Sequence, residues 1–281
     1  MRWIAGFVAA VLCLSVLAAD PFWSTPGREM HTAETEVVIA RYNEADLSWI
    51  AGIGPDSRWL QRISRVTIYN KGPTPVIVPD VLRSSNVAVE VHALPNVGRE
   101  GHTYLHHVLQ RYSTLPDVTI FLPASVPTLA HKVQLARTVV SRTLRTGDSV
   151  FAALDRKIRS ADEVRSLREF HLNEHRSTHP ANASLNPEAR LLPASPRPLG
   201  PWMDEFLPPG VKLRVGFHCG IFSVARRHAR NHTEAHYQRL LDQVSSHSNP
   251  EAGHYLERVW EGVFHPIPDA NVVASIADAE N

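Results

Sequence analysis

Short apolar runs alternate with polar segments over the first half of the chain. Four of these runs are rich in β-branched residues and too short for helices, so they predict strands at 36–40, 65–69, 86–91 and 117–122. Between them, the pattern predicts a helix that begins near Asp46 and a second helix over 101–112. This alternation of strands and helices predicts an α/β fold with a largely parallel sheet.

The second half of the chain has longer amphipathic segments and more proline. Residues 126–176 have a mostly helical, highly charged pattern, whereas 180–210 contain eight prolines and predict a long irregular loop. The pattern then predicts a strand or hairpin followed by two helices, over 215–224, 225–244 and 253–263. Residues 266–281 are small and acidic, which predicts a disordered tail.

The first residues have the pattern of a secretory signal. Arg2 precedes an apolar run over 3–17, and small residues separate this run from Asp20. We predict a signal peptide over 1–19. An uncleaved signal-anchor is the alternative, because the run is near the minimum length for a membrane span. A polar lead-in over 20–35 and one α/β domain over 36–265 would follow. The predicted location is the secretory pathway, with the protein secreted or in the ER or Golgi lumen.

Composition excludes some classes of protein. The 281 residues are 43% hydrophobic and 20% charged, which is enough apolar material for a core and argues against a mainly disordered chain. The net charge of +1 gives no broad attraction for nucleic acid, so we expect no such partner. Cys219 is the only cysteine beyond the signal segment, and we expect a buried thiol. Asn182 and Asn231 begin sequences typical of N-glycosylation sites.

Polar residues, cations and glycines follow the first three predicted strands. Because the carboxyl ends of parallel strands meet at one edge of a sheet, these loops should converge on a ligand site. Glycines permit close backbone approach, the amides of a following helix favour an anion, and Lys71 or Arg99 could neutralise a phosphate. Ordinary turn chemistry is the alternative for any one loop alone. The predicted ligand-binding residues are Arg41, Asn43, Glu44, Asn70, Lys71, Asn96, Gly98, Arg99, Glu100 and His102.

These loops also carry a family resemblance. The sequences Tyr-Asn-Glu at 42–44, Asn-Lys-Gly at 70–72 and Asn-Val-Gly-Arg-Glu at 96–100 resemble the nucleotide-sugar half of glycosyltransferases with the GT-A fold. More closely, the chain resembles an uncharacterised family called domain of unknown function 3431, through segments 38–44, 68–72, 94–104, 115–122 and 249–260. The GT-A resemblance implies a Rossmann-like, mostly parallel sheet flanked by helices. It also implies a nucleotide-sugar donor, a glycan or glycoprotein acceptor, and a donor-pocket role for the loop residues.

One part of the GT-A pattern is missing. In those enzymes the fourth strand usually ends in an Asp-x-Asp-like pair that holds a divalent metal, whereas here Phe-Leu-Pro-Ala-Ser occupies 121–125. Either the reaction is metal-independent, or another residue supplies the ligand, or no transfer occurs. The sequence therefore assigns no metal ligand and leaves the cofactor unknown. His131 could approach the same edge, with a surface helix histidine as the alternative.

The C-terminal part has its own parallel to GT-A enzymes. Segment 216–227 resembles their acceptor-side strand and arginine, and an acidic helical element follows. Since inverting members place the general base for the acceptor hydroxyl in such an element, the resemblance implies catalytic roles for Glu251 and Glu257. It also implies an acceptor-side position for Arg226, His254 and Arg258. We expect Glu257 to face Arg41 or the 96–100 loop, with its pKa raised by burial. A surface helix with a Glu–Arg pair is the alternative.

Two other functions fit parts of the sequence. A non-catalytic protein that binds a carbohydrate or an anion would use the same loops and would need no metal ligands. A metallo-hydrolase would use some of the 16 histidines, two sets of which are spaced at helical intervals, 171/175/179 and 228/232/236. Solvated helix faces explain these spacings more simply. His218 and Cys219 are unsuited to a nucleophile pair, because neighbours on a strand point to opposite faces.

Overall fold

A seven-stranded sheet organises the protein. In the computed structural model, which describes residues 33–153, 158, 160–175, 190–216 and 218–273, the strand order is β3-β2-β1-β4-β6-β5-β7. The strands are β1 Thr35–Arg41, β2 Arg65–Asn70, β3 Ala88–Ala93, β4 Val118–Pro123, β5 Val150–Ala152, β6 Phe222–Ala225 and β7 Val272–Val273. The first four are parallel, and β6 runs antiparallel to both β4 and β5. The predicted fold class, α/β with a mostly parallel sheet flanked by helices, is confirmed.

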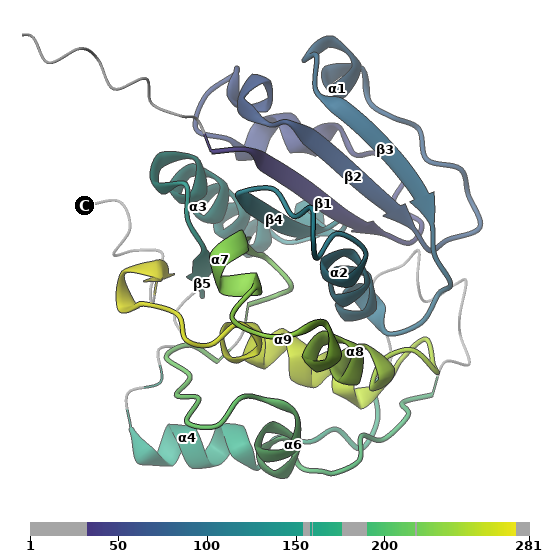
Figure 1. The fold of residues 1–281 in the computed structure, drawn as a ribbon. Coiled ribbons are helices and arrows are strands. Elements are labelled where there is room, and N and C mark those ends of the chain that lie inside the picture. Colours follow the sequence, from purple (N-terminus) through teal and green to yellow (C-terminus); the bar gives the residue numbers. More distant parts are fainter. Residues whose placement is uncertain (1–32, 154–157, 159, 176–189, 217, 274–281) are drawn as a thin grey trace, which may run out of the picture. The chain divides into compact units, whose positions relative to one another are not determined.

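Helices cover both faces of this sheet. The α-helices are α1 Asp80–Ser84, α2 Arg99–Gln110, α3 Ala130–Thr146, α4 Ala161–Arg168, α6 Leu199–Phe206, α7 Arg226–Ala229, α8 Glu234–Asp242 and α9 Glu251–Val263. The 3-10 helices are η1 Ser48–Ile53, η2 Trp59–Arg62, η3 Val126–Thr128 and η4 Asp269–Asn271. Figure 1 shows α2, α8 and α9 on one side of the sheet and α3 on the other. None of the described helices has the length and apolar character needed to cross a membrane.

The residues of β1 explain why both faces are covered. All seven are buried, and the four at 37–40 alternate between two apolar cores. Val38 packs with the core under α2 and α9, whereas Val37 and Ile39 pack with the core under α3. A parallel strand buried on both sides needs apolar residues at successive positions, which is the pattern that predicts this strand.

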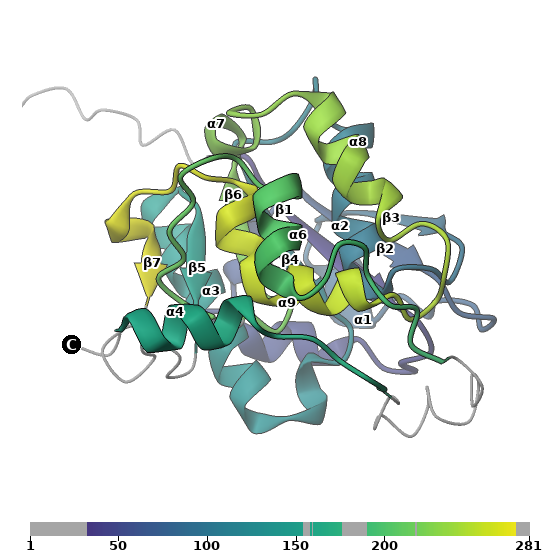
Figure 2. The same ribbon diagram turned by 90° about the horizontal axis from the view of Figure 1, so that it is seen from below.

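Helix α9 crosses α2 at close range. A Cβ atom at Gly101 would lie 2.9 Å from Cδ1 of Leu256, so a larger residue there would require the end of the Leu256 side chain to move. On its other side, α9 meets α6 through Trp202 and Tyr255, whose ring centroids are 5.7 Å apart. As Figures 1 and 2 show, α4 and α6 form an outer layer beyond α9. The close crossing brings the first turn of α2 next to the middle of α9.

The structure differs from the sequence predictions in three segments. Strand β5 lies within 126–176, where the sequence predicts mostly helix, and α6 lies within the predicted irregular loop over 180–210. The predicted boundary at 265 is also wrong, because η4 and β7 continue the ordered domain and β7 pairs with β5. The predicted signal over 1–19, Asn182 and His179 lie outside the described residues, so their roles stay predictions.

Candidate functional site

The loops after β1 and β2 are tied together by Arg41. Its Nη1 donates to Oδ1 of Asn70 at 2.6 Å and to the carbonyl of Thr74 at 2.8 Å. Its Nη2 donates to Oγ1 of Thr74 at 2.9 Å, and its Nε donates to the carbonyl of Glu44 at 2.8 Å. Thr74, which the sequence analysis does not single out, also donates to Oδ1 of Asn43. These contacts show that Arg41 holds the loops in place and that its guanidinium already has protein partners.

Lys71 also has internal partners. Its buried ammonium donates to the backbone carbonyls of Val97 and Arg99. Burial lowers the pKa of Lys71 to about 7, although the nearby Glu100 opposes this effect. Lys71 therefore fixes the turn at 97–99 from inside, whereas the sequence analysis expects it to meet a phosphate.

The turn that begins α2 has an unusual backbone. Gly98 and Arg99 have φ angles of 63° and 53°, in the left-handed region that is costly for arginine. A Cβ at Gly98 would overlap the carbonyl of Val244, and the Gly98 amide donates to the carbonyl of His247 at 2.7 Å. The predicted glycine is thus required by a close approach of the 244–247 segment. This packing fixes the position from which Arg99 extends.

Arg99 is the centre of a group of charged side chains. Its Nη2 lies 3.0 Å from Oε1 of Glu257, and its Nε lies 3.9 Å from Oε2 of Glu100. The carboxyl groups of Glu100 and Glu257 are themselves in hydrogen-bonding contact. Nδ1 of His254 lies 3.6 Å from Oε2 of Glu257. We call Arg99, Glu100, His254 and Glu257 the carboxyl cluster.

The carboxyl cluster is mostly buried but keeps some exposure to solvent. The side chains of Arg99, Glu100 and Glu257 are 25%, 14% and 12% exposed, so a ligand can reach them. The cluster lies next to the carboxyl ends of β2 and β3, because Lys71 and the 97–99 turn follow those strands. The predicted contact between Glu257 and the 96–100 loop is therefore present, while its catalytic role stays a prediction.

The two carboxyl groups have opposite pKa shifts. Burial is the largest single effect and would raise the pKa of Glu257, but Arg99, Glu100 and Arg258 together outweigh it and hold this pKa below the ordinary value. Burial and the neighbouring negative charge of Glu257 raise the pKa of Glu100 to about 7. Burial, with Arg99 nearby, lowers the pKa of His254 to about 2, so its ring is neutral at physiological pH. The expectation of a raised pKa at Glu257 is wrong, because it did not include a direct contact with Arg99.

Glu251, the other catalytic candidate, has a different environment. Its fully buried carboxylate accepts hydrogen bonds from the amides of Leu172 at 2.7 Å and Ala194 at 2.8 Å. Arg197 approaches the same carboxylate at 3.4 Å. These contacts join two distant segments to the start of α9, which gives Glu251 a structural role in place of the expected catalytic one.

The residues expected on the acceptor side are divided between two places. Arg226 forms an ion pair with Asp117, which precedes β4, so it lies at the opposite edge of the sheet from the carboxyl cluster. The expectation fails because β6 is antiparallel, which puts its carboxyl end at that opposite edge. His254 belongs to the carboxyl cluster. Arg258 donates to the carbonyl of His254 at 2.8 Å and lies 3.5 Å from the ring centroid of Phe170.

Three further ligand candidates have smaller roles in the geometry. Glu44 accepts the amides of Tyr42 and Asn43 and so closes its own turn. His102 is buried on α2, where burial and the charge of Lys71 lower its pKa to about 4. Asn96 is half-buried in the turn before α2, beside the residues that Lys71 holds.

The turn before β6 lies beside the carboxyl cluster. It falls within segment 216–227, which the resemblance puts on the acceptor side, but its own residues are not among the predicted site residues. Cys219 and Gly220 have φ angles of 52° and 66°, and a Cβ at Gly220 would lie 3.4 Å from Oε1 of Glu100. The amide of His218 donates to the carbonyl of Glu257 at 2.9 Å. The hydroxyl of Tyr104 donates to the carbonyl of Gly220 at 2.9 Å. Gly220 is an isolated glycine within the predicted strand or hairpin over 215–224, a signal of close backbone approach that could have indicated this packing, and Cys219 is buried as expected.

The end of β4 does not suit a divalent metal. The strand ends at Pro123, and the amide of Ala124 donates to the carbonyl of Ala40, so apolar residues occupy the position of the usual carboxylate pair. Within the described ranges, no group of three or more His, Cys, Asp or Glu side chains could hold a metal ion. His232 and His236 instead lie within hydrogen-bonding distance of the carbonyls of His265 and Val263.

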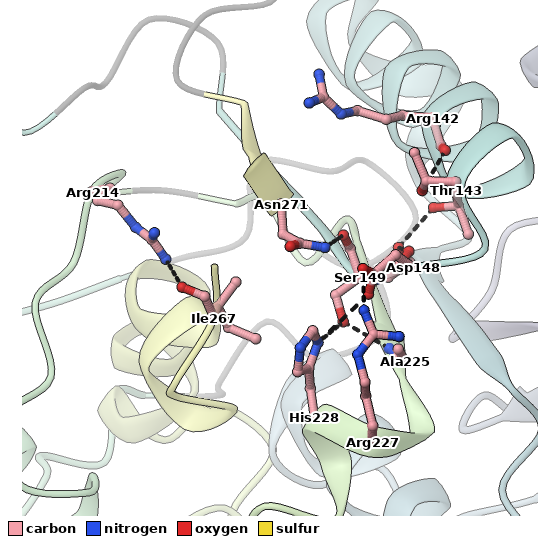
Figure 3. Close-up of polar contacts among 12 residues, drawn as sticks. Arg142, Thr143, Asp148, Ser149, Arg214, Ala225, Arg227, His228, Ile267 and Asn271 are labelled. Atoms are coloured by element: carbon pink, nitrogen blue, oxygen red, sulfur yellow. Dashed lines mark hydrogen bonds and ion pairs between the residues drawn. The ribbon is translucent and has the colours of Figure 1, made fainter. Parts of the chain in front are cut away.

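A second polar group has the residue types of a hydrolase triad. Figure 3 shows Ser149 and His228 pointing toward one another, with Oγ 2.6 Å from Nδ1. Asp148 lies 3.8 Å from the same nitrogen, whereas a triad needs the serine and the carboxylate on different ring nitrogens. Oγ of Ser149 also accepts the amide of Ala225 at 2.7 Å, and Asn271 donates to the Ser149 carbonyl. This group is a buried structural link between β5, β6 and the C-terminal strand.

The solved structures that align with this chain include two phosphoglycerate synthases. The structure of glucosyl-3-phosphoglycerate synthase from Mycobacterium tuberculosis is 16% identical, with 70% of this chain and 58% of that chain covered and a TM-score of 0.30. The same enzyme with Mn2+ and uridine-diphosphate-glucose gives 14% identity, 70% and 57% coverage and a TM-score of 0.33. Mannosyl-3-phosphoglycerate synthase from Rubrobacter xylanophilus is 14% identical, with 70% of this chain and 55% of that chain covered and a TM-score of 0.31. The chain spans just over half the length of these proteins.

Sequence comparisons give a clearer assignment. The search of the curated proteins gives no match. The profile of a family described as "Protein of unknown function (DUF3431)" matches residues 37–275, which include every strand of the sheet except the first two residues of β1. This agrees with the resemblance noted in the sequence. The chain is a member of the DUF3431 family.

Proposed function

We propose that this protein transfers a glycosyl group from a nucleotide-sugar donor to a hydroxyl group of a glycan or glycoprotein. The observation that carries the proposal is the carboxyl cluster, in which Arg99, Glu100 and Glu257 meet beside the carboxyl ends of β2 and β3. Activation of a hydroxyl needs a partly desolvated carboxylate, and binding of a diphosphate needs an accessible cation. The cluster contains both, and the strand-end sequences resemble those of GT-A transferases.

The individual residues divide this work. Arg99 is the cation proposed to meet the donor diphosphate, because its side chain is 25% exposed, whereas Arg41 and Lys71 are buried and donate to backbone carbonyls. Glu100 and Glu257 are the candidates that face the acceptor hydroxyl. The apolar end of β4 provides no metal ligand, so we assign charge neutralisation to the arginine side chain and route no step through a metal.

The N-terminal pattern adds a proposed location. A signal over 1–19 would direct the protein into the secretory pathway, where it would be secreted or stay in the ER or Golgi lumen. Glycan and glycoprotein acceptors are abundant there. Finding intact Met1 on the protein in the membrane fraction would favour the signal-anchor over a cleaved signal.

Binding measurements test the donor part of the proposal. We expect uridine or guanosine diphosphate, or one of their sugar conjugates, to raise the unfolding temperature of the purified protein. Arg99→Ala should weaken this binding by about 2 kcal/mol, since a charge-assisted hydrogen bond is lost. Arg83→Ala is the matched control, because Arg83 pairs only with Asp80 on the exposed helix α1 within the described residues. Parallel measurements with manganese show whether a metal contributes, and no binding to any nucleotide would reject the proposal.

A non-catalytic binding protein is the second candidate. It is favoured by the end of β4, where the residues that usually hold the donor's metal are absent. In that case a carbohydrate or anionic ligand would occupy the same site without turnover. A transfer assay that shows binding but no product, with several acceptors, would support this function over the first.

A further inference from the structure

Two carboxyl groups that touch need a proton between them. Glu100 on the first turn of α2 and Glu257 in the middle of α9 are in hydrogen-bonding contact, and both lie beside the guanidinium of Arg99. If both were ionised, one arginine would face two negative charges in a shielded place. A single shared proton removes that repulsion, as it does in other paired carboxyls.

The geometry indicates where the remaining charge is. Arg99 is 3.0 Å from Glu257 but 3.9 Å from Glu100, so the ion pair is made with Glu257. Glu100 instead packs against the backbone of the turn before β6, at Gly220. While the pair holds one proton, the negative charge therefore lies on Glu257 and the proton lies on Glu100, which is the carboxyl that ionises when this proton leaves.

The surroundings of Glu100 support this distribution. The titratable and charged groups that interact with Glu100 come from the loop after β2, from α2 and from α9, and they are Lys71, Arg99, Tyr104, His254 and Glu257. Of these, Lys71 already donates to two backbone carbonyls, and His254 is neutral because burial lowers its pKa. Burial and the charge of Glu257 raise the pKa of Glu100 to about 7, which suits a group that gains and loses a proton near neutral pH.

We propose that Glu100, and not Glu257, is the general base of the reaction, and that Glu257 is a positioning residue held by Arg99. This inference rests on the proposed transferase function. It moves the base from the carboxylate that the sequence favours to a residue expected among the donor-binding side chains. Glu257 then acts through Glu100, because its charge keeps Glu100 basic.

The proposed step couples a proton transfer to Glu100 with displacement of the nucleoside diphosphate. Ionised Glu100 takes the proton of the acceptor hydroxyl, so that the O–H bond breaks while the acceptor oxygen bonds to the anomeric carbon. The bond from that carbon to the diphosphate oxygen breaks, and its electron pair leaves with the nucleoside diphosphate. Glu100 then returns its proton to water. No oxidant, reductant or second cofactor is needed.

Infrared spectroscopy tests the shared proton without any assay of activity. A protonated carboxyl has a C=O stretch distinct from that of a carboxylate, and its intensity can be followed against pH. We expect the wild-type protein to show a carboxyl that titrates with a midpoint near pH 7 and is missing from Glu100→Gln. In Glu257→Gln the midpoint should move to lower pH, because the neighbouring negative charge is gone. Glu234→Gln, an exposed position on α8, should match the wild type.

Transfer kinetics test the role as base. The rate should rise with pH and level off above about pH 7, and Glu100→Gln should lower it by about 100-fold or more. Glu257→Gln should shift the midpoint of this profile downward. Full activity in Glu100→Gln, or an unchanged midpoint in Glu257→Gln, would overturn the assignment.

The two measurements separate this inference from the proposed function. If the carboxyl titrates near pH 7 but the protein transfers no sugar, the shared proton is supported, while the transferase function and the role of Glu100 as its base are both rejected. If the protein transfers sugar but no carboxyl titrates near pH 7, the transferase function is supported and Glu100 is rejected as its base. If Glu100→Gln does not fold, Glu257→Gln alone still decides, because loss of the neighbouring negative charge should lower the midpoint in that variant and an unchanged midpoint would overturn the assignment.

Discussion

The guanidinium of Arg99 lies 3.0 Å from the carboxylate of Glu257, although 158 positions separate the two residues in the chain. Their ion pair joins the first turn of α2 to the middle of α9. The side chains are 25% and 12% exposed, so water screens this pair less than it screens pairs on the open surface. The contact therefore contributes to stability as well as to the charge of the site.

Removal of this arginine should destabilise the fold. In Arg99→Ala the carboxylate of Glu257 would stay shielded without its partner, and we expect the free energy of unfolding to fall by about 2 kcal/mol. Urea unfolding measures the change. Arg83→Ala removes a pair in which both side chains are exposed, so it should cost less than about 0.5 kcal/mol. Equal losses in the two variants would contradict the structural role of the Arg99 pair.

Arg41 should be more important for stability than for ligand contact. Arg41→Ala removes four hydrogen bonds that join the loops after β1 and β2, and it should lower the free energy of unfolding by about 3 kcal/mol. Thr74→Val removes only the hydroxyl contacts and should cost about 1 kcal/mol. Thermal or urea unfolding checks both values. A stable Arg41→Ala protein that has lost nucleotide binding would instead assign this arginine to the ligand.

Glu251→Gln tests the structural role of the second acidic candidate. The carboxylate accepts two backbone amides, and the NH2 group of glutamine cannot accept either of them. We expect a loss of about 1–3 kcal/mol in stability. The pH dependence of any transfer reaction should stay unchanged. A changed pH profile in a fully stable variant would return Glu251 to the catalytic candidates.

Stability should fall as the pH drops below about 6.5. Burial lowers the pKa values of several histidines to about 4 or less, namely His102, His107, His218, His236 and His254. In the unfolded chain these rings take up protons near pH 6.5, whereas in the folded protein they do not. Each therefore contributes a slope of up to about 1.4 kcal/mol per pH unit between pH 6.5 and 4. Urea unfolding at a series of pH values should show a smaller slope in His236→Gln.

Glu100 should have the opposite influence on stability. Its pKa is about 7 when folded and near the ordinary 4.5 when unfolded, so the unfolded chain releases this proton first as the pH rises. Its contribution is present below pH 4.5 and is lost between pH 4.5 and 7. Glu100→Gln should remove this loss, which the same unfolding series would detect.

Ser149 should show no reactivity as a nucleophile. We expect a fluorophosphonate probe to leave the native protein unlabelled at this serine, because a backbone amide and one histidine nitrogen already engage Oγ. Ser149→Ala should leave the amide of Ala225 without its acceptor and cost about 1–2 kcal/mol in stability. Labelling that Ser149→Ala abolishes would contradict this assignment.

The sequence predicts the parallel half of the sheet well, since buried strands such as β1 need unbroken apolar runs. It fails for β6, because an apolar run does not reveal the direction of a strand. In an antiparallel strand the residues that precede it lie at the site edge, which is why Gly220 lies beside Glu100 and Arg226 does not. The short strand β7 has too few residues for any pattern.

The site was predictable only in outline. The loops that follow parallel strands identify the correct edge and the correct turn, including Gly98 and Arg99. The partner of each charge depends on contacts between distant segments, which local sequence does not contain. Lys71 and Arg99 are both loop cations, yet one faces backbone carbonyls and the other faces a carboxylate.

Helix α9 has acidic residues on two sides with different partners. At its start, Glu251 holds the amides of Leu172 and Ala194, and six positions later Glu257 meets Arg99. A ligand that breaks the contact between Arg99 and Glu257 thus changes the environment of the same helix that binds the segments around Leu172 and Ala194. Hydrogen exchange at Leu172 and Ala194 should therefore respond to an anion bound on the far side of α9, and these two amides would report from outside whether the site is filled.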